Sequence, residues 1–552
     1  MLVVANVVMA AIKIALTRLM APECSTLAGS SFWAIMERLL LLRESNDEVT
    51  LTGSEHFDVV IIGAGLSGIG AGYRLQTRCP GKSYVILEAR ADIGGTWDLF
   101  RYPGIRSDSD MATFSFPFRP WKESRVLADG PSILKYLRET AQEFGIDRHF
   151  RFRQRVLSAS WSSDDAQWTL EVQGENGQIL RYSCDFLYGC TGYYRYDAGY
   201  EPTFPSQEHF SGQIIHPQHW PENLDYAGKK VVVVGSGATA VTLIPAMADT
   251  AAHITMLQRS PGYMLSLPSH DPLANMLKRV LPQSIAFRLV RWKNILVSIG
   301  IYQISRRAPN FARGVLRTIA VKDLPQGYEV DKHFKPSYQP WDQRLCVMPD
   351  SDFYKTINAG RASVVTGEIE TFTERSIRLK SGEELEADII VTATGLRMLA
   401  LGAVQLVIDG TPINPGREFI YKGTMLSNIP NFAFCIGYTN AAWTLRADLA
   451  STYVCRVLNH MDRHGYRTCR PTCESALLEA RPLLGLTSGY VMRSAADLPK
   501  SATRAPWLIR QNYIRDMLTM KVGRLEDGVL TFSKTAALTR ADIAEEVRAA
   551  GD

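Results

Sequence analysis

The stretch that decides the fold is FDVVIIGAGLSGIGAGYRL, residues 57–75. Its first half is a run of β-forming residues, which is typical of a buried parallel strand. Gly63, Gly65 and Gly68 then form the pattern G-x-G-x-x-G where the strand turns into a helix. The first glycine permits the tight turn, the second lets a phosphate approach the backbone, and the third lets the helix pack on the strand. The pattern therefore predicts a Rossmann unit that holds a pyrophosphate at the helix N-terminus.

The next predicted strand strengthens this interpretation, since a lone glycine pattern is a weak signal. The segment SYVILEA, residues 83–89, places Glu88 at the strand end, twenty residues after Gly68. An acidic side chain at that position can accept hydrogen bonds from ribose hydroxyls. Together the two strands and the glycine turn predict a dinucleotide site.

The same arrangement returns at KKVVVVGSGATAVTLIPAMA, residues 229–248, where Gly235, Gly237 and Ala240 give G-x-G-x-x-A. Here the following strand, HITMLQRS, ends in Arg259 and Ser260 instead of an acid. A cation and a hydroxyl suit the 2′-phosphate of an adenosine ribose better than a bare hydroxyl. The alternative is that Arg259 is only a solvated charge at a strand end. We expect FAD at the first site and NADPH at the second.

Composition limits the class of protein. The chain has 552 residues, 46% hydrophobic and 21% charged, which predicts a soluble globular protein of two or three domains. A net charge of +5 is too mild to indicate a nucleic-acid partner. The nine cysteines form no CxxC pair and no zinc spacing, and their odd number does not suit a disulfide framework. We therefore expect a reducing cytoplasm and no metal site.

Residues 1–55 precede the first domain as an N-terminal extension. The apolar stretch at residues 1–16 is interrupted at Lys13 and is shorter than the roughly 20 residues that span a bilayer. A second apolar patch, residues 32–42, has helical spacing. The extension is either an accessory or mis-started segment, a peripheral membrane anchor, or a true span, and a secretory signal is disfavoured. Membrane association through this extension is thus one alternative beside a purely cytoplasmic location.

Two further motifs lie between and around the glycine turns. The segment GGTWDLFRYPGIRSDSD, residues 94–110, contains glycines that let a loop pass close to a flavin while an indole covers it. The segment FSGQIIHPQHWP, residues 210–221, follows the pattern F-x-G-x-x-x-H-x-x-x-W-P. The residues at its fixed positions are Phe210, Gly212, His216, Trp220 and Pro221.

These motifs resemble the class B flavin monooxygenases, the Baeyer–Villiger type. The stretches FRYPGIRSDSDM, HPQHWPENLDY, PWDQRLCVMPD and GYTNAAWTL are most similar to one branch, which contains the ethionamide-activating and the long-chain-alkane-linked flavin-binding monooxygenases. The resemblance implies an FAD- and NADPH-dependent enzyme that uses molecular oxygen. It implies a C4a-peroxyflavin that inserts one oxygen atom into small apolar ketones, forming esters, or onto sulfur.

Two other functions stay open. One is a monooxygenase or hydroxylase of long-chain alkane degradation, although an unactivated C–H bond offers neither a lone pair nor a carbonyl to such an oxidant; a ketone derived from an alkane suits the chemistry better. The other is a redox-sensing flavoprotein that binds both nucleotides without oxygenating a substrate.

The resemblance also assigns residues. It places the catalytic arginine at Arg344 and its acidic partner at Asp108; a purely structural ion pair is the alternative. A guanidinium is always charged and suits the stabilisation of an oxygen anion. Many relatives carry a basic residue where this chain has Gln343. We therefore expect the 2′-phosphate to be bound mainly by Arg259 and Ser260. The flavin-site residues that it implies are Gly95, Thr96, Trp97, Tyr102 and Asp108.

The segment around His216 is implied to link the two domains, and His216 is implied to hold that linker as the domains shift. Its alternatives are direct chemistry by the imidazole, or simple packing of His216 and Trp220 at the domain junction.

The predicted fold is α/β, with two Rossmann-like dinucleotide-binding domains and a helical insertion. We expect the FAD domain at 56–200 and again at 386–552, with the NADPH domain inserted at 201–385. Its helical insertion, 265–325, has no Asp or Glu from Pro272 to Lys322 but ten Lys and Arg residues among apolar ones. That pattern predicts either a solvated helical subdomain or a surface that meets membrane lipid or apolar substrate.

Overall fold

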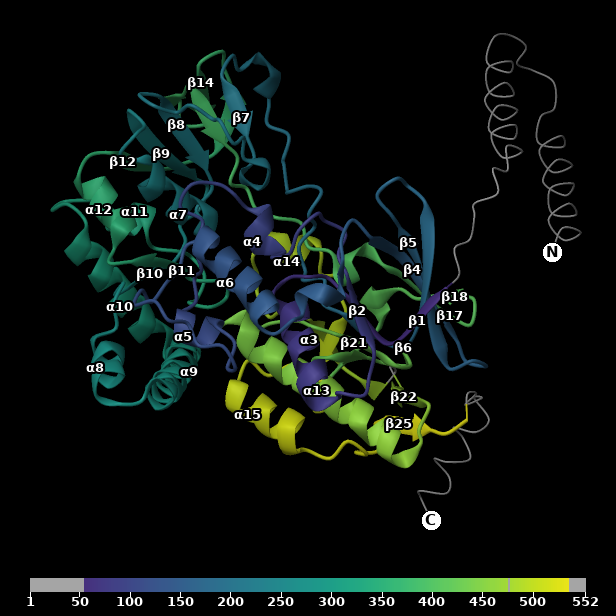
Figure 1. Cartoon of the computed structure of the whole chain (residues 1–552). Coiled ribbons are helices and arrows are strands. Elements are labelled where there is room, and N and C mark those ends of the chain that lie inside the picture. The colour runs from purple at the N-terminus through teal and green to yellow at the C-terminus, as the bar shows by residue number, and fades with distance from the viewer. Residues whose placement is uncertain (1–53, 475–476, 536–552) are drawn as a thin grey trace, which may run out of the picture. The chain divides into compact units, whose positions relative to one another are not determined.

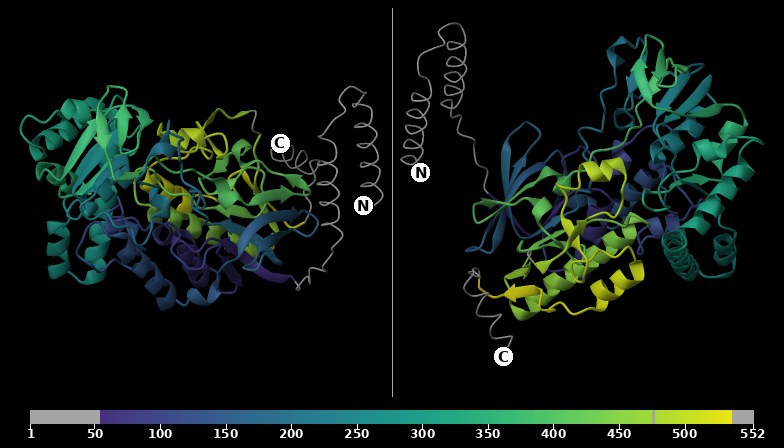
Figure 2. Two further views of the ribbon diagram at one scale, coloured as in Figure 1. Left: turned by 90° about the horizontal axis from the view of Figure 1, so that it is seen from above. Right: turned by 180° about the vertical axis from the view of Figure 1, so that it is seen from behind.

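The computed structural model describes residues 54–474 and 477–535 (Figure 1). The N-terminal extension at 1–55, for which a peripheral anchor is one of the alternatives, therefore lies outside the described residues, except for its last two positions. Two separate sheets organise the described chain, one of nine strands and one of five. They lie apart from one another in every view (Figures 1 and 2). The predicted α/β fold with two Rossmann-like sheets is confirmed.

The nine-stranded sheet is built on β1 (Glu55–Ile62), which pairs in parallel with β2 (Tyr84–Leu87) and β6 (Ile179–Gly189). The apolar run of β1 is buried, as predicted. Helix α3 (Leu66–Arg78) follows it, and α13 (Trp443–His464) packs on α3. On the outer sides, β3 (Phe150–Arg151) pairs with β2, and β21 (Phe432–Phe434) pairs with β6, both in parallel. Segments from both ends of the described chain therefore make this one domain.

An antiparallel extension completes the nine-stranded sheet. The order along it is β18-β17-β4-β5-β6-β1-β2-β3, with β21 beside β6. Strand β6 pairs with β1 along one edge, and along its other edge it pairs with β5 through residues 179–184 and with β21 through residues 187–189. The added strands are β4 (Arg155–Ser162), β5 (Gln167–Gln173), β17 (Gln405–Ile408) and β18 (Thr411–Pro412).

The five-stranded sheet is parallel throughout, in the order β12-β9-β8-β16-β7. Helix α7 (Ala238–Met247) follows β8, as the second glycine pattern predicted. The return to the flavin domain does not begin at 386, because residues 389–391 form β16, a fully buried inner strand of this second sheet. The chain leaves the domain only after Val391. The strands are β7 (Gln213–Ile215), β8 (Lys230–Val234), β9 (His253–Gln258), β12 (Ala362–Thr366) and β16 (Ile389–Val391).

Three helices form the insertion in this second domain: α8 (Pro272–Val280), α9 (Gln283–Arg307) and α10 (Pro309–Asp323). They begin later than the expected residue 265, because residues 264–267 form strand β10 (Met264–Leu267). That strand pairs in parallel with β11 (Cys346–Pro349). The helices lie together on one side of the second domain (Figure 1). Among the described residues, no helix combines the length and the apolar character needed to cross a bilayer.

Two chain segments connect the two sheets, and they run side by side. The N–H of Leu399 donates to the carbonyl of Tyr193 at 3.0 Å, and the N–H of Tyr200 donates to the carbonyl of Gly395 at 3.1 Å. Between these bonds, Tyr194 and Met398 form an antiparallel bridge. The outgoing and returning connections therefore hold each other in a short two-stranded ladder.

The remaining elements cover the two sheets. The helices are α4 (Thr96–Leu99), α5 (Met111–Phe114), α6 (Gly130–Glu143), α11 (Val330–His333), α12 (Asp352–Asn358), α14 (Gly489–Arg493) and α15 (Tyr513–Met517), the last running into a π-helical turn at Leu518–Val522. The short strands are β13 (Ile369–Phe372), β14 (Ser376–Leu379), β15 (Glu384–Glu386), β19 (Ile420–Tyr421), β20 (Met425–Leu426), β22 (Thr468–Pro471), β23 (Ala480–Pro482), β24 (Lys500–Ala502) and β25 (Leu530–Ser533).

Candidate functional site

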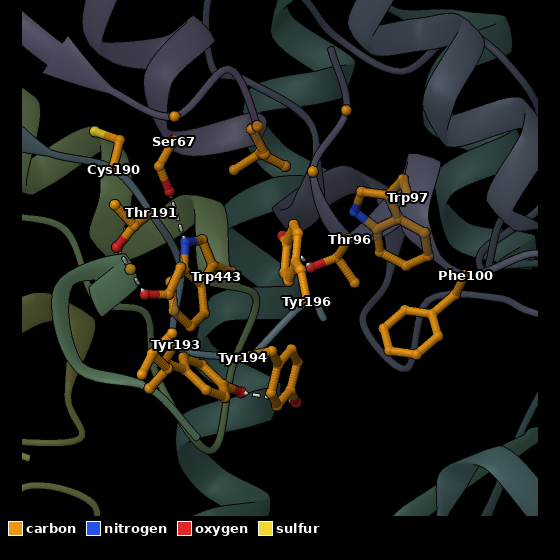
Figure 3. Close-up of a pocket in the computed structure, with 18 of the residues that line it drawn as sticks. Ser67, Thr96, Trp97, Phe100, Cys190, Thr191, Tyr193, Tyr194, Tyr196 and Trp443 are labelled. Carbon is orange, nitrogen blue, oxygen red and sulfur yellow. Dashed lines mark hydrogen bonds between the residues drawn. The ribbon is translucent and has the colours of Figure 1, made fainter. Parts of the chain in front are cut away.

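A cavity of about 500 Å³ opens at the carboxyl ends of β1, β2 and β6. This edge is where parallel α/β sheets bind their ligands. The first turn of α7, from the second domain, lines the same cavity through Ala238 and Thr239, and so does Arg344. Figure 3 shows the aromatic side chains that gather in it. Both predicted nucleotide sites therefore open on one shared space.

The first glycine turn has the strict geometry that its pattern predicted. Gly63 has φ +105°, and a side chain there would lie 2.7 Å from the carbonyl oxygen of Cys190. A Cβ on Gly68 would lie 1.9 Å from the carbonyl oxygen of Gly63. Neither position accepts any other residue without displacing backbone. The turn from β1 into α3 is therefore as tight as a dinucleotide fold requires.

Both helices that face the cavity begin without a cap. Gly65 precedes α3 and Gly237 precedes α7, and neither helix has a side-chain cap or an acidic residue in its first turn. The free N–H groups and the helix dipole make each N-terminus an anion site. A Cβ on Gly237 would meet no atom within 4 Å, so this backbone is open to a close ligand. The two N-termini therefore fit the phosphates of two dinucleotides.

Glu88 lies at the end of β2, as predicted, and its carboxylate is fixed. It accepts hydrogen bonds from the N–H of Ala64 at 2.8 Å and from the N–H of Arg90 at 2.9 Å. Burial raises the pKa of Glu88, and these two N–H groups work against that rise. Because Glu88 also lines the cavity, its oxygens can accept hydrogen bonds from ribose hydroxyls there.

Aromatic side chains form the wall where the two domains meet. The indole N–H of Trp443 donates to Ser67 Oγ at 2.8 Å, and the ring of Tyr193 lies 4.9 Å from that indole (Figure 3). Opposite them, Thr96 Oγ1 lies 3.4 Å from the hydroxyl of Tyr196. Trp97 packs edge-on against Phe114, with 5.6 Å between ring centroids. This wall offers flat apolar surfaces to a ring system.

Several of these residues were not predicted as site residues. They are Ser67, Tyr193, Tyr194, Tyr196 and Trp443, all of which line the cavity. A signal for the tyrosines existed in the sequence, because the run TGYYRY follows β6 directly. The carboxyl end of a strand beside β1 must lie at the same edge as the glycine turn.

Arg344 and Asp108 come together in the cavity although they are far apart in the chain. Arg344 Nε lies 3.3 Å from Asp108 Oδ2, and a third of the arginine side chain, 33%, is exposed. Burial alone would lower the pKa of Arg344, but the Asp108 carboxylate outweighs it and the pKa lies above its ordinary value. The cavity therefore contains a permanent, oriented cation that can stabilise negative charge on oxygen.

Tyr102 joins the flavin-site segment to the second domain. It lines the cavity, is buried, and packs in the core around β8 and α7. Burial raises the pKa of Tyr102 to about 12, while hydrogen bonds to Thr242 and Thr239 of α7 lower it. The hydroxyl is therefore protonated at ordinary pH and holds the segment against the helix. Gly95, with φ +55°, starts the turn that carries Thr96 and Trp97 into the cavity.

Arg259 and Ser260 lie outside the cavity, at the far end of the second site. Both are exposed and follow β9, beside the glycine turn that follows β8. The hydroxyl of Ser236 in that turn donates to the carbonyl of Ser260 at 3.2 Å. Arg259 has no side-chain hydrogen bond or ion pair among the described residues. Its positive charge interacts electrostatically with the carboxylate of Glu368, but no direct contact among the described residues keeps the guanidinium from a phosphate. Ala240 is buried in α7 beneath the turn.

The residues of the FSGQIIHPQHWP motif also lie outside the cavity, at the connection between the domains. His216 Nε2 donates to the carbonyl of Gly395 at 3.3 Å, and Nδ1 accepts from the N–H of Gln218 at 3.2 Å. Burial lowers the pKa of His216, so the ring is neutral near pH 7. A Cβ on Gly199 would lie 2.1 Å from this ring. The histidine therefore packs against both connecting segments, at Gly199 and at Gly395, and it does not line the cavity.

The other motif residues pack around the same connection. A Cβ on Gly212 would lie 2.2 Å from the carbonyl oxygen of Asp388, so only glycine lets β7 approach β16 here. Phe210 is buried among the side chains behind the second sheet, and Trp220 packs partly buried against its core. Pro221 is exposed. These positions favour a role in the linker over direct chemistry.

Comparisons with known proteins agree with this geometry. The model of the flavin-binding monooxygenase-like family matches residues 57–401. The FAD-containing monooxygenase EthA of Mycolicibacterium smegmatis is 53% identical over 489 residues, which cover 88% of this chain and 99% of that protein. The probable FAD-binding monooxygenase AlmA of Acinetobacter baylyi is 48% identical, over 87% of this chain and 97% of that protein. An oxidized steroid monooxygenase bound to NADP has the same fold, with TM-score 0.70, 22% identity, and coverage of 87% of this chain and 100% of that chain.

Proposed function

Because the chain belongs to the flavin-binding monooxygenase-like family, we propose that it uses FAD, NADPH and molecular oxygen to insert one oxygen atom into apolar ketones, forming esters, or to add it to sulfur. Flavin-dependent monooxygenation is the reaction class; the choice of ketones and sulfides is the proposal. The observation that carries it is the shared cavity, in which two uncapped helix N-termini and the Arg344 cation meet.

The charge at each strand end decides which nucleotide fits which site: the acidic site suits FAD and the cationic site suits NADPH. FAD would lie along the N-terminus of α3, with its ribose at Glu88 and its ring system at the aromatic wall of Trp443 and Tyr193. NADPH would lie along the N-terminus of α7, with its 2′-phosphate at Arg259. When bound, the flavin supplies the activation of oxygen and the nicotinamide supplies the electrons. The residues of the chain bind and orient the two nucleotides, and they exclude water from the space around them.

Arg344, paired with Asp108, is the group that we propose as catalytic. Negative charge arises on oxygen when oxygen is activated and when a carbonyl is attacked, and a cation held in a largely buried cavity stabilises that charge. Asp108 restrains the guanidinium so that little reorganisation is needed. The apolar part of the lining, which includes Phe114, Leu399 and Val404, suits an apolar ketone or sulfide.

Two alternatives make different predictions. The motifs that resemble the long-chain-alkane-linked branch support a role in the use of long-chain alkanes, where a ketone derived from the alkane suits the cavity chemistry better than the alkane itself. A redox-sensing flavoprotein would bind both nucleotides and oxidise NADPH without an oxygenated product.

A substrate panel tests the reaction class. We expect ketones and thioethers to increase NADPH oxidation and to give ester or sulfoxide in stoichiometric amounts, measured by coupled spectrophotometry and mass spectrometry of products. Long-chain ketones and the matching alkanes in the same panel distinguish the alkane-linked alternative. If NADPH oxidation gives only hydrogen peroxide across the whole panel, the proposal fails.

Coenzyme choice gives a second expected result. Because no direct hydrogen bond or ion pair occupies the Arg259 guanidinium among the described residues, we expect kcat/KM to favour NADPH over NADH by about ten- to a hundredfold. Arg259→Ala should remove most of that preference through the KM for NADPH, since the 2′-phosphate is far from the transferred hydride. Steady-state kinetics with both coenzymes measures it.

The control for this result is Arg375→Ala, which changes an exposed arginine of the second domain whose side chain has no hydrogen bond or ion pair among the described residues. It should leave the preference unchanged. Added salt should weaken NADPH binding more in the parent than in Arg259→Ala, because the charge pair is screened. If Arg259→Ala keeps the preference for NADPH over NADH, Arg259 is only a solvated charge at a strand end.

A further inference from the structure

Exposed apolar side chains gather on the helical insertion. Among the described residues, nineteen large hydrophobic side chains are exposed, and three of these lie on α8, six on α9 and three on α10. The three helices occupy only residues 272–323. Single exposed hydrophobic residues are normal on a protein surface, but such a concentration marks an interaction site.

The outward face of α9 is a continuous apolar stripe. Ile285, Leu289, Trp292 and Leu296 follow the spacing i, i+4, i+7 and i+11, which places them on one face of a helix. Leu289 is 48% and Leu296 is 54% exposed. The opposite face, through residues such as Phe287, is buried against the protein. Helix α9 therefore carries apolar side chains on both faces, and those of the outer face are about half exposed in the described structure.

Helix α8 repeats the arrangement. Leu273, Met276 and Val280 follow the spacing i, i+3 and i+7, and all three are exposed. Trp292 of α9 also contacts Tyr513 of α15 edge-on, with 6.0 Å between ring centroids. Helix α8 packs against α9, so exposed apolar side chains lie on two neighbouring helices.

The charge of this insertion has a single sign. No Asp or Glu occurs from Pro272 to Lys322, where ten residues are basic. Some of the cations serve the fold: buried Arg291 donates to the carbonyls of Ala112 and Ser115 at 2.7 and 2.8 Å. Others are exposed and have no side-chain partner within the part of the chain that the structure describes. These are Arg279, Arg288, Arg307 and Lys322.

A second cavity lies at the end of the α9 stripe. Its volume is about 630 Å³, and its lining contains five arginines and no Asp or Glu. Gln303 and Arg307 of the lining continue the stripe, seven and eleven residues after Leu296. The same face of α9 thus passes from apolar to basic along its length. The arginines are Arg306, Arg307, Arg481, Arg510 and Arg515, of which Arg306 is ion-paired with Asp342 at 2.6 Å.

We propose that the outer faces of α8 and α9 dock on the surface of an anionic lipid bilayer, with the apolar stripe among the acyl chains and the five-arginine cavity at the phosphate headgroups. A helix of 25 residues is about 38 Å long, which suits a helix that lies flat in the interface. Trp292 has the amphipathic ring that such an interface favours. Unpaired cations beside exposed apolar side chains match a surface that offers both hydrocarbon and negative charge. This docking is independent of the proposed reaction.

Vesicle flotation of the full chain tests the docking. The parent should float with phosphatidylglycerol-containing vesicles and much less with pure phosphatidylcholine vesicles. The double variant L289D/L296D should lose binding, because it places carboxylates in the stripe. The double variant R307E/R481E should weaken binding to phosphatidylglycerol by roughly fivefold or more for each cation. Added salt should weaken the binding of the parent.

Matched controls separate this surface from net charge and from folding. R375E/R463E makes the same charge change at exposed arginines elsewhere, and Leu157→Asp places a carboxylate at an exposed apolar site of the flavin domain. Both controls should bind vesicles like the parent. All variants should retain NADPH oxidation with a soluble ketone, since none of these residues lines the catalytic cavity.

Three outcomes would overturn the docking. The first is that the parent does not bind phosphatidylglycerol vesicles. The second is that L289D/L296D binds them as well as the parent, or that the controls lose binding equally. The third is that the arginine cavity binds inorganic phosphate, seen by calorimetry and lost in R307E/R481E, while no variant changes vesicle binding; the cavity would then be a site for free anions. If the parent gives no oxygenated product, the proposed reaction is contradicted, but the docking proposal is not affected.

Discussion

Arg344→Ala is expected to lower ester and sulfoxide formation by about a thousandfold while the flavin stays bound and is still reduced by NADPH. The reason is geometric: Arg344 reaches the cavity where the two nucleotide sites meet, and Asp108 holds it there at 3.3 Å. Removing it takes away the positive charge that stabilises negative oxygen, but takes no contact from either glycine turn. Stopped-flow reduction under nitrogen, followed by product analysis in air, measures the two parts separately.

Two companion variants sharpen this result. Arg344→Lys retains a charge but loses the planar guanidinium, so we expect only partial recovery of product. Asp108→Asn leaves the arginine in place without its restraint, and should lower product yield less than Arg344→Ala does. In each variant NADPH oxidation should yield hydrogen peroxide instead of product. A normal ester yield in Arg344→Ala would reject the catalytic assignment and leave a structural ion pair.

Gly68→Ala is expected to give a protein without flavin, and hence without any oxygenation. The new Cβ would lie 1.9 Å from the carbonyl oxygen of Gly63, a distance that no relaxation of a side chain can relieve, because the clash is with backbone. Helix α3 must move away from β1, which distorts the N-terminus that faces the cavity. The flavin content of the purified protein, read from its absorbance and from the fluorescence of released flavin, measures the effect.

The matched control is Gly81→Ala, in the loop that follows α3. It makes the same chemical change in the same domain, and its Cβ would meet no atom within 4 Å. It should therefore purify with its full flavin content and normal activity. Circular dichroism of both variants separates loss of flavin from loss of fold. Full flavin content in Gly68→Ala would show that the phosphate site does not depend on this helix contact.

The glycine turns could be predicted from the sequence because their chemistry is local. The spacing of Gly63, Gly65 and Gly68 specifies a conformation within a few residues, and the structure contains it. The partnership of Arg344 with Asp108 is different, since more than two hundred residues separate them and only resemblance to a family could bring them together. Nothing in the local pattern of either residue reveals the other.

The contacts of the aromatic wall and the pairing of strand β16 both depend on packing between segments that are far apart in the chain. Trp443 opens a long helix, and its place beside Ser67 depends on the packing of α13 on α3, which no short pattern records. Residues 389–391 fall inside the expected second part of the flavin domain, 386–552, because an apolar strand pattern does not show which sheet the strand joins. Its membership of the second sheet follows from pairing with β7 and β8.

The way in which one domain interrupts the other also dictates an order of folding during synthesis. The nine-stranded sheet needs β21, and α3 needs the cover of α13, whose Trp443 contacts a residue 376 positions earlier in the chain. The five-stranded sheet is complete once β16 has been made. Because domains fold as their last segment leaves the ribosome, the domain that starts second finishes first. The glycine turn after β1 therefore lacks the cover of α13 until residues 443–464 have been made, and we expect flavin uptake to follow the synthesis of that helix.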